Sequence, residues 1–271
     1  MHATLNSGQP VEITTLAVRS DHPSGAPFDA GPSSEFMRHN RISDAYFWQS
    51  RQAFPEICLT ATTEDGTVVA NAHAVRFAAD GPGREELPEG GWEQVVVWAF
   101  MDDRQGVAST TACALDISVA VTVQGQGLAR LMLDALRRAT ADSGLTSLVA
   151  PVRPTWKDRE PRTPMEEYAK RVRADGLPYD PWLRTHVRAG GQLVGVAPTS
   201  WVIAASLSRW RGWTGLPFDE DGPVDVPHAL VPVQCDTQAG YAVYVEPNVW
   251  VRHAVGDLSP TARDLDGGGF R

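Results

Sequence analysis

The sequence lacks the residue patterns of a disulfide framework or a metal centre. Its three cysteines, Cys58, Cys113 and Cys235, are far apart and form no C-x-x-C pair. Its seven histidines include no HExxH motif and no comparable paired spacing. Disulfide-stapled domains and zinc sites depend on such spacings. We therefore expect neither, and we assign no metal ligand.

Positive charge and long apolar runs are also scarce. The chain has 33 Asp and Glu residues against 24 Lys and Arg, a formal net charge of −9. Binding along a nucleic acid needs a basic face, so no nucleic-acid partner is expected. No apolar run approaches the length of a membrane span, and the first residues lack a basic stretch followed by an apolar core. We expect a cytoplasmic protein without a membrane partner.

The residues that are present have the proportions of a globular protein. Of 271 residues, 42% are hydrophobic and 21% are charged. No internal repeat or low-complexity linker divides the chain. We expect one domain over residues 1–255, as a monomer or a homodimer, and a loose glycine-rich tail over residues 256–271.

Hydrophobic periodicity predicts an interleaved series of strands and helices. The expected strands are Val11–Val18, Ile57–Thr63, Thr67–Phe77, Gln94–Met101, Ala112–Val123, Ser147–Val152, Leu193–Val196, Trp201–Leu207 and Gly240–Arg252. The expected helices are Glu35–Phe54, Leu128–Asp142, one opened by a capping box at Thr163–Glu166, one from Asp180 to Gly190, and a turn at Arg209–Trp213. Loops rich in Pro and Gly are expected at Ser20–Ser34 and Asp80–Gly91. This order predicts a mixed α/β fold.

The most informative segment is a junction between a strand and a helix. The β-branched run Ile117–Val123 precedes Gln124, Gly127 and Ala129, which give the spacing Gln-x-x-Gly-x-Ala. A turn with little side-chain bulk at a helix start leaves backbone N–H groups free to bind a phosphate. No acidic side chain occupies the first helical turn to oppose an anion. The segment therefore predicts a site for a phosphorylated ligand.

A dinucleotide-binding fold explains this junction poorly. Gly125 and Gly127 would fill the first two positions of Gly-x-Gly-x-x-Gly, but Arg130 occupies the third, where close packing needs a small residue. The next strand, Ser147–Val152, offers no acidic residue for a ribose. The junction also follows a series of strands and does not open the first βαβ unit.

The junction resembles motif A of the GNAT superfamily of acyl-CoA-dependent N-acyltransferases. That motif is Arg/Gln-x-x-Gly-x-Gly/Ala with a Val five residues earlier, and Val119, Gln124, Gly127 and Ala129 occupy its positions. The order of elements over residues 10–255 is also similar. The resemblance implies a central mixed β-sheet splayed around an acyl-CoA cleft and flanked by helices. Relative to the family, extra segments are expected near residues 80–111 and 153–179.

The resemblance also implies how the donor, acetyl-CoA or another acyl-CoA, is bound. The glycine turn holds the pyrophosphate, and the preceding strand offers its backbone to the pantetheine arm. One backbone N–H of that strand, at Val119 or Ala120, points at the thioester carbonyl. The implied donor-binding residues are Ser118, Val119, Ala120, Val121, Gln124, Gly125, Gln126, Gly127, Leu128 and Ala129.

Two residues are candidates for proton transfer. His186 stands where the family usually has a tyrosine that protonates the leaving thiolate; it would act as a protonated acid or as a neutral hydrogen-bond donor. The alternative is a histidine on the helix face beside Trp182 that only forms a structural hydrogen bond. Asp116 shares a strand face with Ser118, and a carboxylate there is costly unless it is paired or working as a base. Two alternatives to Asp116 as the base stay open: the carboxylate has a structural partner, or the amine loses its proton to ordered water.

The acceptor is expected at the extra segment Arg153–Tyr179, because loops leaving strand ends commonly carry substrate sites. The candidate contacts are Trp156, Lys157, Asp158, Arg159 and, on a late strand, Glu246. The same segment also fits a covering flap with ordinary surface charges.

The implied function is direct acyl transfer to a small-molecule or peptide amine. No nucleophile motif indicates a covalent enzyme intermediate. Two alternatives stay open: an acyl donor bound to a carrier protein, and a non-catalytic acyl-CoA-binding module.

Overall fold

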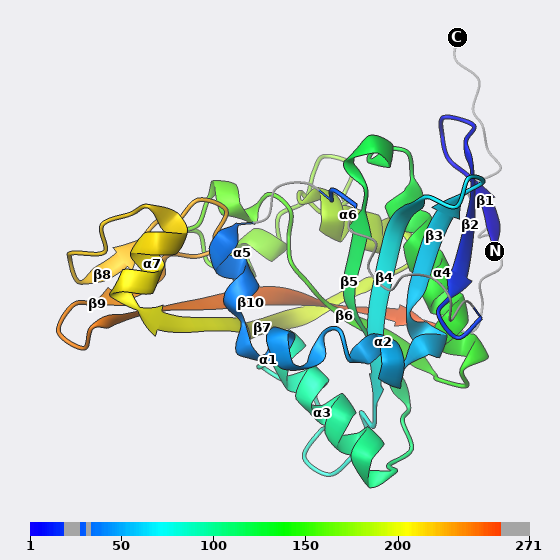
Figure 1. Ribbon diagram of the computed structural model, residues 1–271, viewed down its shortest axis with the longest axis horizontal. Coiled ribbons are helices and arrows are strands. Elements are labelled where there is room, and N and C mark those ends of the chain that lie inside the picture. The colour runs from blue at the N-terminus through cyan, green and yellow to red at the C-terminus, as the bar shows by residue number, and fades with distance from the viewer. Residues whose placement is uncertain (19–27, 31–33, 256–271) are drawn as a thin grey trace.

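The computed structural model describes residues 1–18, 28–30 and 34–255, which build one ten-stranded, mostly antiparallel sheet (Figure 1). The strands are β1 (His2–Thr4), β2 (Pro10–Thr15), β3 (Leu59–Thr63), β4 (Val68–Phe77), β5 (Thr111–Val119), β6 (Ser147–Val152), β7 (Gln192–Ser206), β8 (Gly222–Val224), β9 (Val233–Asp236) and β10 (Tyr241–Ala254). Their order is β1-β2-β3-β4-β5-β6-β10-β9-β8, and β7 also pairs with β10. This confirms the expected mixed α/β fold with a central sheet.

The sheet opens into a V between β5 and β6. These strands run parallel and pair only at their first residues, ending at Cys113 opposite Val149. Beyond that point β5 stays paired with β4 as far as Val119, while β6 stays paired with β10 as far as Val152. The inner edge of β5 is therefore left open, and the two strands form the arms of the V.

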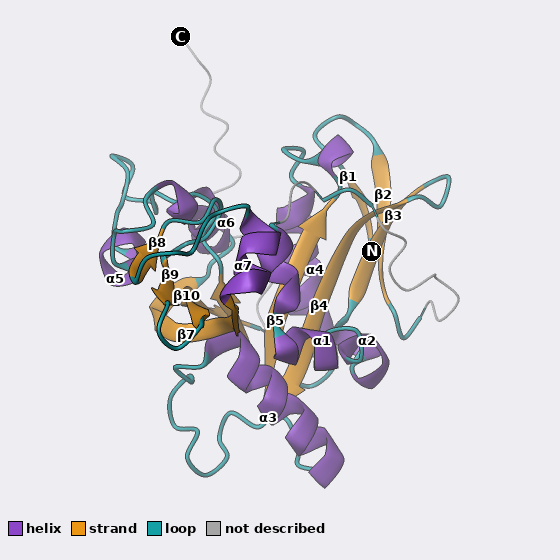
Figure 2. Cartoon of the chain, turned by 60° about the vertical axis from the view of Figure 1, so that its left-hand side comes forward, coloured by secondary structure: helices purple, strands orange, loops and turns teal. Residues whose placement is uncertain are grey.

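Helices cover both faces of this sheet (Figures 1 and 2). The helical segments are η1 (Glu35–His39), α1 (Arg41–Tyr46), α2 (Ser50–Ala53), η2 (Pro55–Ile57), α3 (Gly91–Gln105), η3 (Val121–Val123), α4 (Leu128–Asp142), η4 (Lys157–Arg159), α5 (Met165–Ala169), α6 (Pro181–Arg188) and α7 (Leu207–Thr214). Helices α1 and α3 lie on one face, and α4 lies on the other. The Arg137 guanidinium of α4 donates to the carbonyl of Ala189, which places the end of α6 on the α4 face. None of the helices in the described segments has the length and apolar character needed to cross a membrane.

The far ends of β7 and β10 continue beyond the other strands as an arm, residues 201–246, which includes α7, β8 and β9 (Figure 1). The arm has its own apolar cluster, centred on the fully buried Trp210. Phe36 of η1 packs on Trp210 and on Tyr244, with ring centroids 5.6 and 5.3 Å apart. This contact attaches η1 to the arm.

One expected strand is wrong. Residues Gln94–Met101 belong to helix α3, although three consecutive valines favour extended structure. The buried positions on α3 are Trp92, Val95, Val96, Ala99 and Phe100. They follow the spacing i, i+3, i+4, i+7, i+8 of an amphipathic helix. Burial of that stripe outweighs the weak strand preference of the valines.

Other expectations differ in their boundaries. The helix expected over Glu35–Phe54 is three shorter ones, because the side chain of Asn40 accepts a hydrogen bond from the N–H of Ser43 and starts a new helix. The capping box at Thr163 is not formed, since its hydroxyl donates to Glu160 and α5 is only five residues long. The two strands expected over Leu193–Leu207 are the single strand β7. Most of the loop Ser20–Ser34 and the tail 256–271 lie outside the described residues.

Candidate active site

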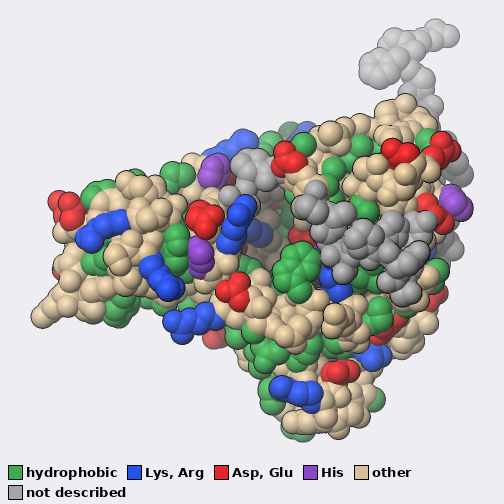
Figure 3. Space-filling model, in the orientation of Figure 1, with side chains coloured by type: hydrophobic (Ala, Val, Ile, Leu, Met, Phe, Trp, Pro, Cys, Tyr) green, Lys and Arg blue, Asp and Glu red, His purple; other side chains and the backbone are tan. Residues whose placement is uncertain are grey.

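A cavity of about 380 Å³ lies where β5 and β6 separate. Its walls include Ala114–Ile117 of β5 and the segment Ala150–Arg153 that ends β6. Trp92, on the α3 face, and Trp182 and His186, on α6, also line it. The cavity therefore passes through the opening in the sheet, and in Figure 3 the surface is hollowed between the arm and the rest of the molecule. Two ligands can approach one point from opposite faces.

The turn after β5 has the geometry of an anion site. Gly125 and Gly127 have φ values of +74° and +84°, a region that glycine enters without strain. Gly127 is the N-cap of α4 and makes no side-chain capping bond, and the first turn of α4 contains no acidic residue. The Gln124 amide faces the protein, because it donates to the carbonyls of Val119 and Ala30 at 3.0 Å each. Gln124 thus holds the turn in shape, and the helix N-terminus is left to bind the anion.

Alternate residues of β5 form hydrogen bonds with β4, and the residues between them direct their N–H groups at the opening. The N–H of Ala120 donates to Val69 on β4 at 2.9 Å, and that of Val121 donates to Asp29 at 2.8 Å. In an antiparallel pair, alternate residues of a strand direct their N–H groups away from the partner. Val119 and Ile117 therefore point theirs at the open edge, and Ile117 also lines the cavity. The Ala120 N–H is therefore occupied and cannot donate to a carbonyl in the cavity, whereas the N–H of Ile117, which was not among the expected donors, is open to it.

Asp116 lies in the cavity wall with two polar partners. The Ser118 hydroxyl donates to both of its carboxylate oxygens at 2.9 Å, and Nδ1 of His73 lies 3.3 Å from one of them. His73 is directly opposite Asp116 in the β4–β5 register and is buried beside Phe47. The carboxylate itself is 32% exposed, so it is both oriented by neighbours and accessible to a ligand.

His186 is buried and paired with a second histidine. Its Nδ1 lies 2.9 Å from Nε2 of His253 on β10, and its ring meets Trp182 edge-on. Burial and the neighbouring His253 lower the pKa of His186 to about 3; burial and Arg137 lower the pKa of His253 to about 4. His186 is therefore neutral at neutral pH, which excludes the protonated-acid interpretation. Two interpretations stay open: a neutral hydrogen-bond donor to the leaving thiolate, and a helix-face histidine with a structural role.

The pairing also favours one tautomer of His186. Nδ1 of His253 is buried and has no partner among the described residues. An unpaired N–H there, close to the Arg137 charge, costs more than an unpaired lone pair. His253 therefore carries its proton on Nε2 and donates it to Nδ1 of His186. The remaining proton of His186 is then on Nε2.

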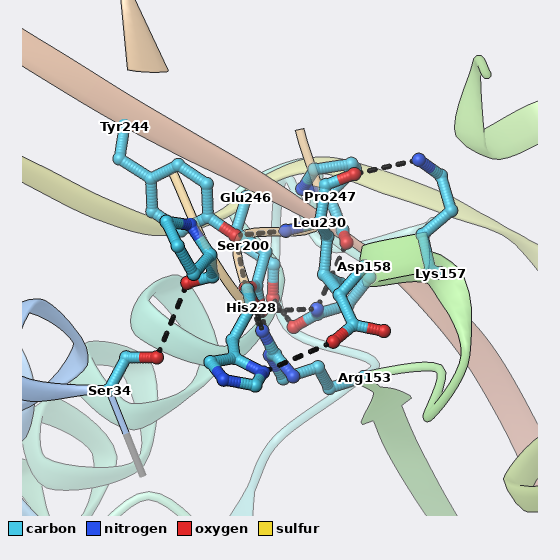
Figure 4. A network of polar contacts seen from close by, with 12 residues as sticks. Ser34, Arg153, Lys157, Asp158, Ser200, His228, Leu230, Tyr244, Glu246 and Pro247 are labelled. Carbon is cyan, nitrogen blue, oxygen red and sulfur yellow. Dashed lines mark hydrogen bonds and ion pairs between the residues drawn. The ribbon is translucent and has the colours of Figure 1, made fainter. Parts of the chain in front are cut away.

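A buried ion pair stands at the other arm of the V (Figure 4). Nε of Arg153 donates to both oxygens of Glu246, at 3.2 and 3.0 Å. The Tyr244 hydroxyl and the Asn248 amide also donate to Glu246, which is 1% exposed. With its oxygens occupied in this way, Glu246 orients Arg153 and has little capacity left for a ligand.

Comparison with known proteins agrees with this geometry. No family model matches the chain. The chain is 38% identical over 190 residues to arginine N-acetyltransferase avaD of Aspergillus versicolor, a match covering 63% of this chain and 66% of that protein. Its fold is similar to that of the loading GNATL domain of CurA from Lyngbya majuscula, at TM-score 0.54 and 15% identity over 90% of this chain and 98% of that chain. This chain is therefore similar to an N-acetyltransferase in sequence and to a GNAT-like domain in fold. It spans just under two thirds of the length of its curated relative.

The four candidate acceptor contacts Trp156, Lys157, Asp158 and Arg159, in the segment after β6, lie away from the cavity. The Lys157 ammonium is fully buried and donates to three carbonyls, among them Leu230 on the arm. Asp158 lies 3.4 Å from His228, and the Arg159 guanidinium stacks over Trp156. None of the four candidates in this segment lines the cavity described above. Lys157 and Asp158 fasten the segment to the arm, and the buried Lys157 is not the ordinary surface charge that the covering-flap interpretation expects.

Three residues that contact the candidate site residues were not expected from the sequence, for the same reason. His73, His253 and Arg153 reach the site through pairings with Asp116, His186 and Glu246. Each pairing joins positions far apart in the chain, and no local motif marks it. A weak signal existed for Arg153 alone, since it directly follows an apolar strand.

Acid is expected to destabilise this fold through the histidine pair. Unfolded imidazoles titrate near pH 6.5, whereas folded His186 and His253 stay neutral to about 3 and 4. Below pH about 6.5 the unfolded state therefore binds more protons than the folded state does. As the pH is lowered, the free energy of unfolding decreases by up to about 1.4 kcal/mol per pH unit for each histidine. Denaturant titrations between about pH 7 and pH 5 measure this slope.

The double variant His186→Gln and His253→Gln is expected to flatten that slope. The control is His2→Gln, because the His2 side chain is 88% exposed and its loss leaves the slope as it is. Equal slopes in the double variant and the natural protein would contradict the assignment.

Proposed function

We propose that this protein is an acyl-CoA-dependent N-acyltransferase that acylates a small amine. The observation that carries the proposal is the open edge of β5, which runs from the anion-binding turn to the cavity in the sheet. The name of the relative, arginine N-acetyltransferase, makes acetyl-CoA and arginine the first donor and acceptor to test.

The donor would lie along β5. Its pyrophosphate binds at the N-terminus of α4, where the dipole and the free N–H groups of Leu128–Ala129 favour an anion. The pantetheine arm, which carries amides of its own, hydrogen-bonds to the open edge at Val119. The thioester carbonyl reaches the N–H of Ile117, which stabilises negative charge on its oxygen in the transition state.

The acceptor would enter from the α3 face. Its neutral amine attacks the thioester carbon, a C–N bond forms, and the C–S bond then breaks. Asp116, oriented by His73 and Ser118, takes the proton that the nitrogen loses. The neutral His186 donates a hydrogen bond from Nε2 to the departing thiolate, which takes a proton from water to become CoA thiol, and Asp116 returns its proton to water. No covalent enzyme intermediate is required.

The test is turnover by the purified full chain. Arginine and acetyl-CoA are expected to give free thiol and N-acetylated arginine in equal amounts. A thiol assay measures the first product, and mass spectrometry measures the second. The same mixture without arginine measures hydrolysis. Acyl-CoA binding without turnover of any amine would replace the proposal with a binding module. If turnover occurs only with an acylated carrier protein, that protein and not acyl-CoA is the acyl donor.

A further inference from the structure

We propose that Arg153 binds the carboxylate of the acceptor, so that this protein selects α-amino acids over amines of similar shape that lack a carboxylate. The inference rests on the proposed function, since it concerns the acceptor half of the same cavity. Its basis is the position, orientation and charge of Arg153.

Arg153 stands across the V from the reacting point. Both arms diverge after the pair Cys113 and Val149; Ile117 is four residues further along β5, and Arg153 is four residues beyond Val149. At about 3.3 Å per residue, both lie about 13 Å along their arms. Both also line the cavity. A ligand whose amine meets Asp116 beside Ile117 therefore has Arg153 on the opposite wall.

The Arg153 guanidinium is held along one side and open along the other (Figure 4). Its Nε is bound by Glu246, and its Nη2 donates to the carbonyl of His228 at 2.6 Å. Within the described residues, Nη1 makes no hydrogen bond, and the side chain is 38% exposed. A guanidinium oriented in advance loses little freedom on binding a carboxylate, which matches its planar donors.

Charge in the cavity restricts where a carboxylate can bind. Asp116 and Glu246 are the acidic residues in its wall, His186 is neutral, and Arg153 is the single Lys or Arg among its lining residues in the described chain. Asp116 repels an anionic group from its own wall, the Arg153 charge offsets that of the paired Glu246, and Arg153 alone offers an anion a charged donor. The remaining net negative charge favours a ligand that also carries a cationic side chain, as arginine does.

The experiment compares arginine with agmatine, which has the same guanidinium and an amine but no carboxylate. The ratio of their kcat/KM values is expected to favour arginine by about 10- to 100-fold, the effect of one charged hydrogen-bonded contact. In the double variant Arg153→Gln and Glu246→Gln, this ratio is expected to fall to within about threefold of one. Changing both residues avoids leaving the buried Glu246 without its partner. The matched control is Arg162→Gln with Asp225→Gln, an exposed ion pair on the arm side.

Calorimetric binding of both amines to the same proteins separates this inference from the proposed function. If the natural protein binds arginine more tightly than agmatine and the double variant does not, Arg153 binds the carboxylate, whether or not turnover occurs. Equal binding and equal turnover of the two amines by the natural protein would overturn it, and so would a double variant that keeps the preference. Absence of acetylation with intact, Arg153-dependent binding would refute only the proposed function.

Discussion

Replacing Ala129 by glutamate is expected to weaken acetyl-CoA binding about tenfold or more relative to replacing it by glutamine. Ala129 lies in the first turn of α4, where the uncapped N–H groups would hold the pyrophosphate. Glutamate and glutamine differ little in size, so the difference between the two variants isolates the repulsion between the carboxylate and the phosphates. Calorimetric titration with acetyl-CoA measures it.

The same substitution is expected to change stability in the opposite direction. A carboxylate in the first turn of a helix interacts favourably with the dipole, by about 0.3–1 kcal/mol at low ionic strength. Without ligand, the Ala129→Glu variant should thus unfold at the same or a slightly higher temperature than the Ala129→Gln variant. If both variants bind acetyl-CoA equally well, the pyrophosphate does not bind at this helix terminus.

Replacing Asp116 by asparagine is expected to lower kcat for amine acetylation by about 100-fold, the usual contribution of a positioned general base. Asparagine keeps the size of the side chain and its bond to the Ser118 hydroxyl but cannot take the proton. Acetyl-CoA affinity should stay within about threefold, because no donor contact is assigned to the Asp116 carboxylate. Steady-state kinetics and donor titration measure the two quantities.

Asp225→Asn is the matched control, since Asp225 makes an exposed ion pair with Arg162 on the arm side. It is expected to leave kcat unchanged. If Asp116→Asn retains at least half of kcat, the proton leaves through ordered water, and the pairing of Asp116 with His73 is structural.

The sheet and most of its strands were predictable because their signals are local. The Asp65-Gly66 turn between two runs of strand-forming residues identifies the hairpin of β3 and β4. Asp180 begins α6 by accepting hydrogen bonds from the N–H groups of Trp182 and Leu183. Helix α3 was predicted wrongly because a run of valines carries strand preference, while its helical stripe gains stability only by packing against the sheet.

The polar pairs around the cavity were not predictable because each joins residues from distant segments of the chain. Asp116 and His73 are 43 residues apart in sequence, His186 and His253 are 67 apart, and Arg153 and Glu246 are 93 apart. A register shift of one residue between β4 and β5 would direct His73 to the other face of the sheet from Asp116. Nothing in the types or the spacing of these residues along the sequence shows which of them come into contact.

The sequence by itself determined the donor turn of this protein. A left-handed glycine at position 127 and a helix start without an acidic residue are set by neighbouring residues, so the pattern around Gln124 carries the geometry. Only the tertiary structure decided what faces the turn across the opening in the sheet. The open N–H of Ile117, the neutral state of His186 and the exposed edge of Arg153 all follow from how distant segments pack together, because that packing fixes hydrogen-bond phase, burial and charge partners.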